Sequence, residues 1–302
     1  MLSSTTIKEE SAKLGFSACG MSRAERISAE AEHDYREWLV QGGNASMDYL
    51  NRNLEMRFDP RVLVPGVKTI VSVALNYKPR HEIPDGELQL AAYSLGTDYH
   101  FVMKDRLRQL AEALNLTEYR AFCDSGPVME RYWAEQAGLG WIGRNQQLVI
   151  PHAGSMFFLG ELFVMDEVDK YDSPCRNRCG KCRSCIDACP TGCLAGGSFD
   201  AEKCLSYQTI ENRGELSELA KEKMGDTFYG CDRCVKACPW MRFAKPTDVE
   251  EFSPKDALLH MTRDDWQNLT VEQYRMLFKN SAVKRAKYEG LKRNIDAALE
   301  KK

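Results

Sequence analysis

Ten of the twelve cysteines in this 302-residue chain lie within residues 175–238, and their spacing constrains the fold more than any other feature. The run CGKCRSCIDACP places four cysteines within residues 179–190. A shortened version of it, CDRCVKACP, occupies residues 231–239. Thiols gathered so densely bind metal when the compartment keeps them reduced. The pattern therefore predicts a small metal-binding domain in this stretch.

Zinc modules also use paired Cys-x-x-Cys motifs, so zinc is the competing metal. The spacing Cys-x2-Cys-x2-Cys-x3-Cys-Pro, however, is that of bacterial ferredoxins, in which three thiolates hold one [4Fe–4S] cluster and the fourth reaches the second cluster. The second run matches only the last three positions, and Cys204 is the natural substitute for the missing one. The sequence therefore predicts two [4Fe–4S] clusters, one held by Cys179, Cys182, Cys185 and Cys238, the other by Cys189, Cys204, Cys231 and Cys234.

Four cysteines lie outside this assignment. We expect Cys175 and Cys193, which flank the first run, to be ordinary free thiols, with additional cluster ligands as the alternative. Cys19 and Cys123 stand alone in the sequence, and we expect them to be small buried apolar residues.

The rest of the chain does not have a ferredoxin pattern. Helical patterns such as FVMKDRLRQLAEALN alternate with short β-branched or aromatic runs such as TIVSVALNY up to about residue 165. No Gly-x-Gly-x-x-Gly turn and no phosphate loop occurs, so a nicotinamide or flavin site has no local support. We predict an α+β fold with a mixed α/β domain over residues 1–168, a bacterial-type two-cluster ferredoxin domain over 169–246 and a short C-terminal basic helical segment over 247–302.

The N-terminus carries Glu9 and Glu10 where the core of an export signal would be apolar, and no run of about 18 apolar residues occurs. With 43% hydrophobic and 28% charged residues, the composition is that of a globular protein. We therefore expect a cytoplasmic protein with no membrane partner, and we expect it to be a monomer.

The charge distribution is uneven. The net charge of −3 does not indicate a nucleic-acid partner, but the last 24 residues hold eight basic side chains against three acidic ones. Lys287 and Arg293 in this segment are candidates for contacts to phosphates, and a solvated surface helix is the alternative.

Several longer segments resemble one family. The runs CDSGPVMERYWAEQAGLGWIGRN, GSMFFLGEL, KCLSYQTIENRG and YGCDRCVKACPW, together with the cluster motifs, resemble epoxyqueuosine reductases, the cobalamin-dependent enzymes of queuosine synthesis in tRNA. The similarity covers nearly the whole chain in order. It implies reduction of the epoxide of epoxyqueuosine at the tRNA wobble position, giving queuosine. The partners would be tRNA carrying epoxyqueuosine and an external electron donor.

The resemblance also implies a cofactor. Cobalamin would lie base-off between the α/β domain, which thereby becomes a cobalamin- and substrate-binding domain, and the ferredoxin domain, whose clusters would reduce it. His100 is not followed by the glycine of the corrinoid-ligating Asp-x-His-x-x-Gly pattern, so no histidine ligand to cobalt is expected.

Asp124 in CDSGP matches the family's proton donor, which is needed because deoxygenating an epoxide leaves an oxyanion. A structural aspartate in a turn is the alternative. Tyr93 and Tyr99 are further candidates to face the site. The resemblance implies cobalamin contacts at Arg57, Leu148, Leu159, Leu162 and Ser206, where a local ion pair or core packing is the competing interpretation.

The sequence departs from the family's pattern in one respect. Longer relatives continue into a helical-repeat domain, whereas this chain stops at Lys302, which puts the family's usual mode of tRNA binding in doubt. The alternative functions are a cobalamin-dependent reductase of another substrate, similar to dehalogenases, and an iron–sulfur electron-transfer protein without a substrate. A zinc-ribbon protein that binds RNA is a third.

Overall fold

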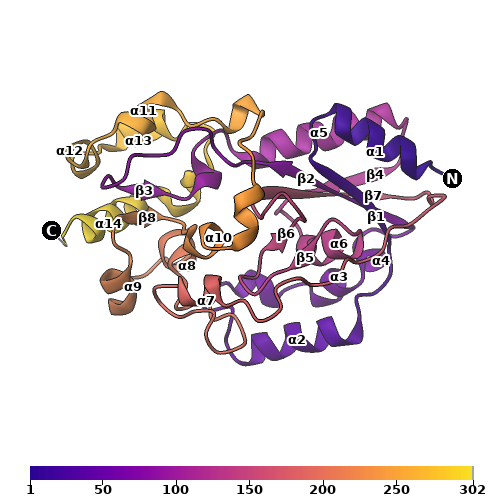
Figure 1. The fold of residues 1–302 in the computed structure, drawn as a ribbon, viewed down its shortest axis with the longest axis horizontal. Helices are drawn as coiled ribbons and strands as arrows, with labels where there is room; N and C mark the ends of the chain where they lie inside the picture. The colour runs from indigo at the N-terminus through magenta and orange to yellow at the C-terminus, as the bar shows by residue number, and fades with distance from the viewer. Residues whose placement is uncertain (301–302) are drawn as a thin grey trace.

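The computed structural model describes residues 1–300. Its largest sheet lies at the end of the molecule where the chain begins (Figure 1). This sheet is antiparallel throughout, with the strand order β1-β2-β7-β4. The central strands are long and apolar, and seven of the eight residues of β2 are buried. The bounds are β1 (Ala18–Arg23), β2 (Thr69–Asn76), β4 (Tyr119–Phe122) and β7 (Phe157–Val164).

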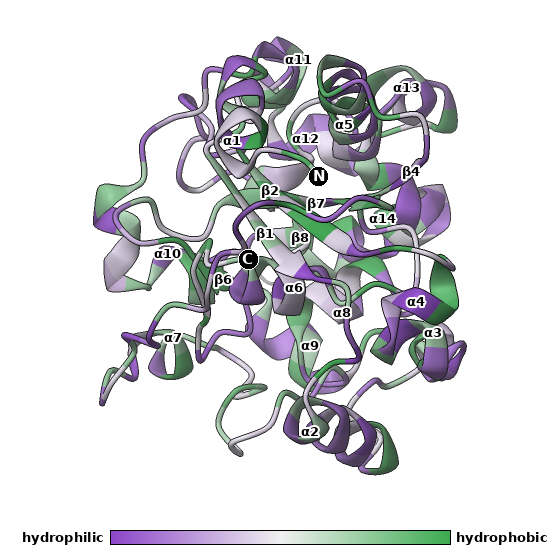
Figure 2. Cartoon of the chain, turned by 90° about the vertical axis from the view of Figure 1, so that its right-hand side faces the viewer, coloured by the Kyte–Doolittle hydropathy of each residue, from purple (hydrophilic) through white to green (hydrophobic). Residues whose placement is uncertain are grey.

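Helices cover both faces of this sheet, as Figure 1 shows. Alternate residues of β2 point to opposite sides, so Val71 and Val73 pack in the core beneath α1 and α5, whereas Ala74 packs on the other side, beneath α6. The bounds are α1 (Ser4–Lys13), α5 (Tyr99–Ala113) and α6 (Glu130–Gln136). In Figure 2 the strands of the sheet are largely hydrophobic, whereas the outer helix α2 presents hydrophilic residues.

Short elements surround the sheet. The chain between β1 and β2 forms α2 (Ala29–Val40), η1 (Asp48–Asn51), α3 (Leu54–Phe58) and α4 (Pro60–Leu63). A small antiparallel hairpin, β5 (Trp141–Ile142) with β6 (Leu148–Val149), follows α6.

The cysteine-rich region has little regular structure. It contains α7 (Ser184–Asp187), α8 (Leu205–Ile210), α9 (Glu218–Lys223), β8 (Thr227–Tyr229), α10 (Arg233–Lys236) and η3 (Pro239–Phe243). The strand β8 pairs in parallel with β3 (Gln89–Leu90), which comes from the segment between β2 and α5. Distant parts of the sequence are therefore joined here by backbone hydrogen bonds.

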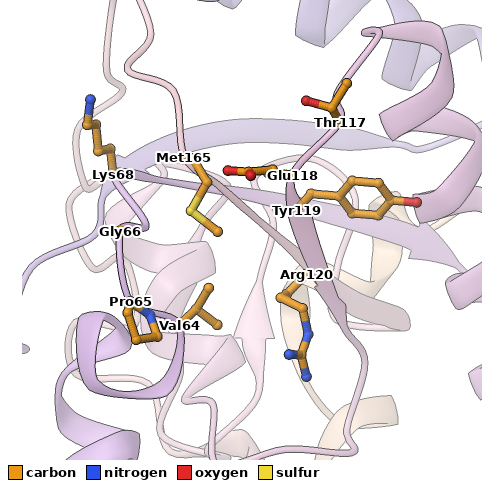
Figure 3. A pocket seen from close by; sticks show the side chains of 9 residues that line it. All are labelled: Val64, Pro65, Gly66, Lys68, Thr117, Glu118, Tyr119, Arg120 and Met165. Atoms are coloured by element: carbon orange, nitrogen blue, oxygen red, sulfur yellow. The ribbon is translucent and has the colours of Figure 1, made fainter.

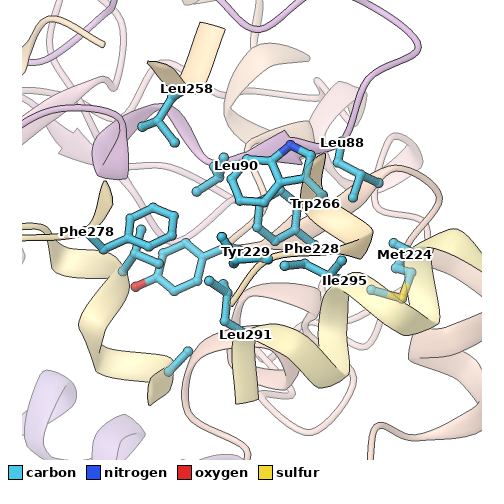
Figure 4. Close-up of a cluster of buried hydrophobic side chains, with 14 of the residues drawn as sticks. Leu88, Leu90, Met224, Phe228, Tyr229, Leu258, Trp266, Phe278, Leu291 and Ile295 are labelled. Carbon is cyan, nitrogen blue, oxygen red and sulfur yellow. The ribbon is translucent and has the colours of Figure 1, made fainter. Parts of the chain in front are cut away.

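The C-terminal residues complete a second hydrophobic core. They form η4 (Glu250–Phe252), α11 (Asp256–His260), α12 (Arg263–Gln267), α13 (Val271–Leu277), η5 (Ala282–Ala286) and α14 (Lys287–Leu299). In the earlier part of the chain, the short helix η2 (Ala92–Ser94) follows β3. Figure 4 shows this core, in which Leu88 and Leu90 meet Phe228, Trp266 and Leu291. It thus combines residues from all three predicted ranges, and the boundaries at 168 and 246 stay predictions.

The basic C-terminal segment is packed on one side. Leu291 and Ile295 of α14 are fully buried. The Arg293 guanidinium donates hydrogen bonds to the backbone carbonyl oxygens of Gln208 (3.0 Å) and Asn212 (3.1 Å) near the end of α8. This side chain therefore holds two parts of the fold together, whereas Lys287 is exposed.

No helix within residues 1–300 combines the length and apolar character needed to cross a membrane.

A carboxylic acid is buried in the middle of the large sheet. Glu161 of β7 is fully buried and lies opposite Ser72 of β2, whose hydroxyl donates to one carboxyl oxygen at 2.5 Å. The other oxygen has no hydrogen-bond partner within residues 1–300. Burial raises the pKa of Glu161 well above its ordinary value. The carboxyl group of Glu161 therefore stays protonated in the native protein at pH values where it is ionised in the unfolded chain.

Replacing Glu161 with Gln should remove one source of pH dependence from the stability. As pH rises from the ordinary pKa of 4.5 toward the raised pKa of the native state, Glu161 is protonated in the native protein but ionised in the unfolded chain. The free energy of unfolding of the wild type should therefore fall by up to about 1.4 kcal/mol per pH unit in this interval. The free energy of unfolding of Glu161→Gln, relative to that of the wild type, should increase as pH rises from 4.5 to 7.5, measured by anaerobic urea denaturation. Glu9→Gln, at an exposed position, is the control. A difference that stays constant with pH would contradict the assignment.

Candidate functional site

The eight thiols that the spacing singles out lie in two neighbouring groups. Cys238 of the second run lies close to Cys179, Cys182 and Cys185 of the first, whereas Cys234 lies close to Cys231, Cys204 and Cys189 and also to Cys185. The first group contains Cys179, Cys182, Cys185 and Cys238. The second contains Cys189, Cys204, Cys231 and Cys234. No three His, Cys, Asp or Glu side chains within residues 1–300 converge on a site for a single metal ion.

The hairpin β5–β6 lies against both groups. The Trp141 indole N–H points at the Cys179 sulfur, 3.4 Å away, and the Asn145 amide donates to the backbone carbonyl of Cys234 at 3.4 Å. The Arg144 guanidinium donates to the carbonyl of the residue after Cys179 at 2.8 Å. Hydrogen bonds to ligand sulfurs are among the factors that set cluster potentials. Through these three hydrogen bonds, the run WIGRN of the hairpin contacts both groups of thiols.

The four other cysteines differ in their surroundings. Cys123 is fully buried in the core beneath α5, and Cys19 is partly buried against the same core. Cys175 is partly exposed, whereas Cys193 is buried beside the second group.

Asp124 lies in an exposed loop directly after β4. Its backbone adopts a left-handed conformation, with φ of 49°, which is uncommon for a residue other than glycine. The Tyr99 hydroxyl donates to the Asp124 carboxylate, and the Asp124 backbone N–H donates to the carboxylate of Glu130. The Tyr99 ring stacks on Phe158 of β7 at 4.3 Å, nearly parallel. Three elements, α5, α6 and β7, thus fix the position of one exposed carboxylate.

The electrostatics of this constellation favour bound protons around Asp124. Burial and the negative charge of Asp124 raise the pKa of Glu130. Burial and the same neighbouring carboxylate raise the pKa of the Tyr99 hydroxyl. Burial lowers the pKa of the adjacent Arg131, against the attraction of the two carboxylates. Asp124 therefore has two neighbours whose protonated, uncharged forms are favoured by their surroundings.

Glu130 was not recognised from the sequence alone. It belongs to the same run as Asp124, but the spacing of six residues has no helical or strand periodicity that would bring the two together. The only local signal is an acidic residue at the start of a helix, which commonly serves the helix itself.

The residues expected to contact cobalamin are only partly brought together. The Arg57 side chain is 8% exposed, and its Nε has no hydrogen-bond partner within residues 1–300. Leu148 of β6 and Leu159 of β7 share one hydrophobic cluster. Leu162 points to the opposite face of the sheet, toward α1 and α5, because residues three apart on a strand alternate in direction. Its side chain therefore does not meet that of Leu159. Ser206 is half-buried in the first turn of α8.

His100 is engaged within its own helix. Its Nδ1 lies 2.7 Å from the Asp98 carboxylate, which also caps the start of α5. The ring stacks on Tyr99 at 4.2 Å. Tyr93, by contrast, donates its hydroxyl hydrogen to Tyr229 at 3.2 Å, inside the core.

One contact links the surroundings of Asp124 to the C-terminal part of the chain. The Arg285 guanidinium donates to both carboxylate oxygens of Glu211, at 2.8 and 2.7 Å. It also lies 5.9 Å from the ring centre of Tyr49, which is 45% exposed. Burial, and next the negative charge of Glu211, raise the pKa of Tyr49 to about 12; Asp124 is close enough to contribute. The loop that carries Asp124 thus lies near the Tyr49 ring and the Arg285 guanidinium, which is paired with Glu211.

A pocket of about 590 Å³ lies elsewhere, near the start of β4 (Figure 3). It is open, and its lining includes Lys68, Glu118, Arg120 and Met165. None of the cysteines and none of the residues expected to contact cobalamin belongs to its lining.

Comparisons with known proteins agree over nearly the whole chain. Residues 57–125 match the family described as epoxyqueuosine reductase QueG, DUF1730, and residues 178–241 match the 4Fe-4S double cluster binding domain. An epoxyqueuosine reductase of Cellulophaga algicola is 41% identical over 97% of each chain, and that of Leadbetterella byssophila is 43% identical over 97% of each. That of Escherichia coli is 35% identical over 97% of this chain and 79% of its own.

Solved structures give the same result. A crystal structure of epoxyqueuosine reductase with an epoxyqueuosine-modified tRNA-Tyr stem loop has a TM-score of 0.87 at 25% identity, covering 98% of this chain and 80% of its own. The enzyme from Streptococcus thermophilus also reaches 0.87, at 29% identity and the same coverage. For the enzyme from Bacillus subtilis the TM-score is 0.84 at 26% identity, again with this coverage; its catalytic loop, which carries an aspartate, is swung out of the active site.

Proposed function

The chain belongs to the epoxyqueuosine reductase family, and from this we propose that it reduces the epoxide of tRNA-bound epoxyqueuosine to queuosine, with Asp124 as the proton donor. The observation that carries the proposal is similarity over nearly the full length to oxidoreductases of this name. The tRNA substrate is supported by the relative that was crystallised with an epoxyqueuosine-modified stem loop.

Electrons would come from an external donor and pass through two [4Fe–4S] clusters. The match of residues 178–241 to a double-cluster domain supports this route. The grouping of thiols supports the crossed ligand assignment, because Cys238 of the second run lies with Cys179 of the first, and Cys189 of the first lies with Cys234 of the second.

Arg57 is suited to contacting cobalamin. Its buried Nε lacks a partner among the described residues, and a buried donor without a partner is costly unless a ligand satisfies it. The apolar residues Leu148 and Leu159 would contact the corrin, and Ser206 would approach it from α8. When bound, cobalamin supplies the low-valent cobalt chemistry that opens and deoxygenates the epoxide. The pairing of His100 with Asp98 supports binding without a histidine ligand to cobalt.

The role of the protein is to deliver a proton to the oxygen that leaves the epoxide. Asp124 is exposed at the loop and can meet a substrate, while Tyr99 holds its carboxylate and Glu130 holds its backbone. Both neighbours have raised pKa values, so their uncharged forms are favoured and they add little negative charge beside Asp124. The swung-out loop of the Bacillus subtilis enzyme supports a loop that can move relative to its site.

The basic segment offers a test of how tRNA is bound. Changing the exposed Lys287 to Gln should weaken tRNA binding and lower the slope of log affinity against log salt by roughly one, if this lysine contacts a phosphate. Arg293→Gln should lower the thermal stability instead, because that side chain bonds to carbonyls of the fold. A salt series of binding curves and a melting curve for each variant measure both effects. An unchanged salt slope for Lys287→Gln would place the phosphates elsewhere.

The activity can be tested directly. Anaerobic protein, reconstituted with iron, sulfide and cobalamin and supplied with a chemical reductant, should convert epoxyqueuosine in tRNA to queuosine, measured by mass spectrometry of the digested nucleosides. Retained cobalamin without this conversion would favour a reductase of another substrate. Failure to retain cobalamin through gel filtration would favour an electron-transfer protein.

A further inference from the structure

A ninth thiol lies within the second group of cysteines. The Cys193 side chain is 5% exposed, and its sulfur is 3.4 Å from the sulfur of Cys189. Cys193 therefore contacts one of the four thiols assigned to the second cluster. Cys175, by contrast, is partly exposed and has no thiol contact among the described residues.

A [4Fe–4S] cluster needs only four thiolates, and the second group supplies these without Cys193. A fifth thiol that does not bind iron can donate its hydrogen to the neighbouring ligand sulfur in an S–H···S hydrogen bond. Such a bond is stronger when the acceptor sulfur carries more negative charge. The reduced cluster carries one electron more than the oxidised cluster, so the bond favours the reduced state.

On the basis of the proposed cluster assignment, we propose that Cys193 is not a ligand but a hydrogen-bond donor that raises the reduction potential of the second cluster. The first group has a donor of a different kind, the Trp141 indole N–H directed at Cys179. The two clusters would thus be adjusted separately, one by an indole and the other by a thiol. This makes Cys193 a tuning residue for the electron supply and gives it no direct contact with the substrate.

Cys193→Ala is the direct test, and it needs neither cobalamin nor tRNA. The reconstituted variant should keep the iron of both clusters. A redox titration followed by electron paramagnetic resonance measures the potential of each cluster. The wave of the second cluster should move to lower potential. At a fixed potential the ratio of reduced to oxidised cluster should fall about tenfold, which corresponds to 59 mV for one electron. The wave that disappears in Cys204→Ala identifies the second cluster.

Two further variants separate donation from packing. Cys193→Ser keeps a hydroxyl donor and should restore most of the potential, whereas Cys175→Ala should leave both waves in place. Loss of half of the iron in Cys193→Ala would overturn the proposal, because it would make Cys193 a ligand. An unchanged potential, or an equal shift in the Ala and Ser variants, would also overturn it. A failure of epoxyqueuosine turnover in the wild type with both waves present would count only against the proposed function.

Discussion

Replacing Asp124 with Asn should lower the single-turnover rate of epoxide reduction by about 10²–10⁴-fold, the usual contribution of a general acid. The amide keeps the shape of the side chain and can still accept the Tyr99 hydroxyl hydrogen, but it cannot supply the proton. Both clusters and cobalamin should remain bound, because the loop makes its other contact through the backbone N–H. Rapid mixing of tRNA with pre-reduced, cobalamin-loaded protein measures the step without interference from slow electron supply.

Asp34→Asn is a matched control, since Asp34 is an exposed aspartate on the outer helix α2. It should react at the wild-type rate. Loss of cobalamin or poor folding in Asp124→Asn would indicate a structural turn residue instead of an acid. A wild-type rate with full cofactor would exclude Asp124 as the acid and make Tyr99 the next candidate.

Replacing Cys238 with Ala should remove the cluster associated with the first run, although Cys238 belongs to the second. The thiol lies near Cys179 and Cys182, so its loss leaves that cluster with three ligands. Cys189→Ala should conversely remove the cluster held with Cys204. Each variant should retain about half of the wild-type iron. Iron analysis together with paramagnetic resonance spectra of the reduced proteins measures the loss.

The two variants control for each other, because they must lose different clusters. Their residual spectra should add up to the spectrum of the wild type. Cys175→Ala should keep all the iron, since Cys175 belongs to neither group. Identical residual spectra from the Cys238 and Cys189 variants, or loss of the cluster of the local run in each case, would contradict the crossed ligand assignment.

The sequence was most informative where the chemistry depends on local spacing. The cysteine runs indicate iron–sulfur clusters, and the double-cluster family match confirms this, because three ligands of a cubane fit within one short turn of chain. The mixed α/β domain is likewise confirmed by the matching crystal structures. The similarity to one family, which covers the chain in order, indicated the function.

The sequence was least informative where distant segments converge. Asp124, Tyr99 and Glu130 meet only because β4, α5 and α6 lie against the same sheet, and no local pattern indicates this arrangement. The two-residue strand β3 is too short to have a periodicity of its own. Leu159 and Leu162 are a different case, since the strand periodicity of two already places residues three apart on opposite faces.

The pairing of β3 with β8 has a consequence for synthesis of the protein on the ribosome. Gln89 pairs with Thr227, and the core around them also needs Leu291 and Ile295 of the last helix. This core therefore cannot close until nearly the entire chain has left the ribosome, and closing so long a loop is slow.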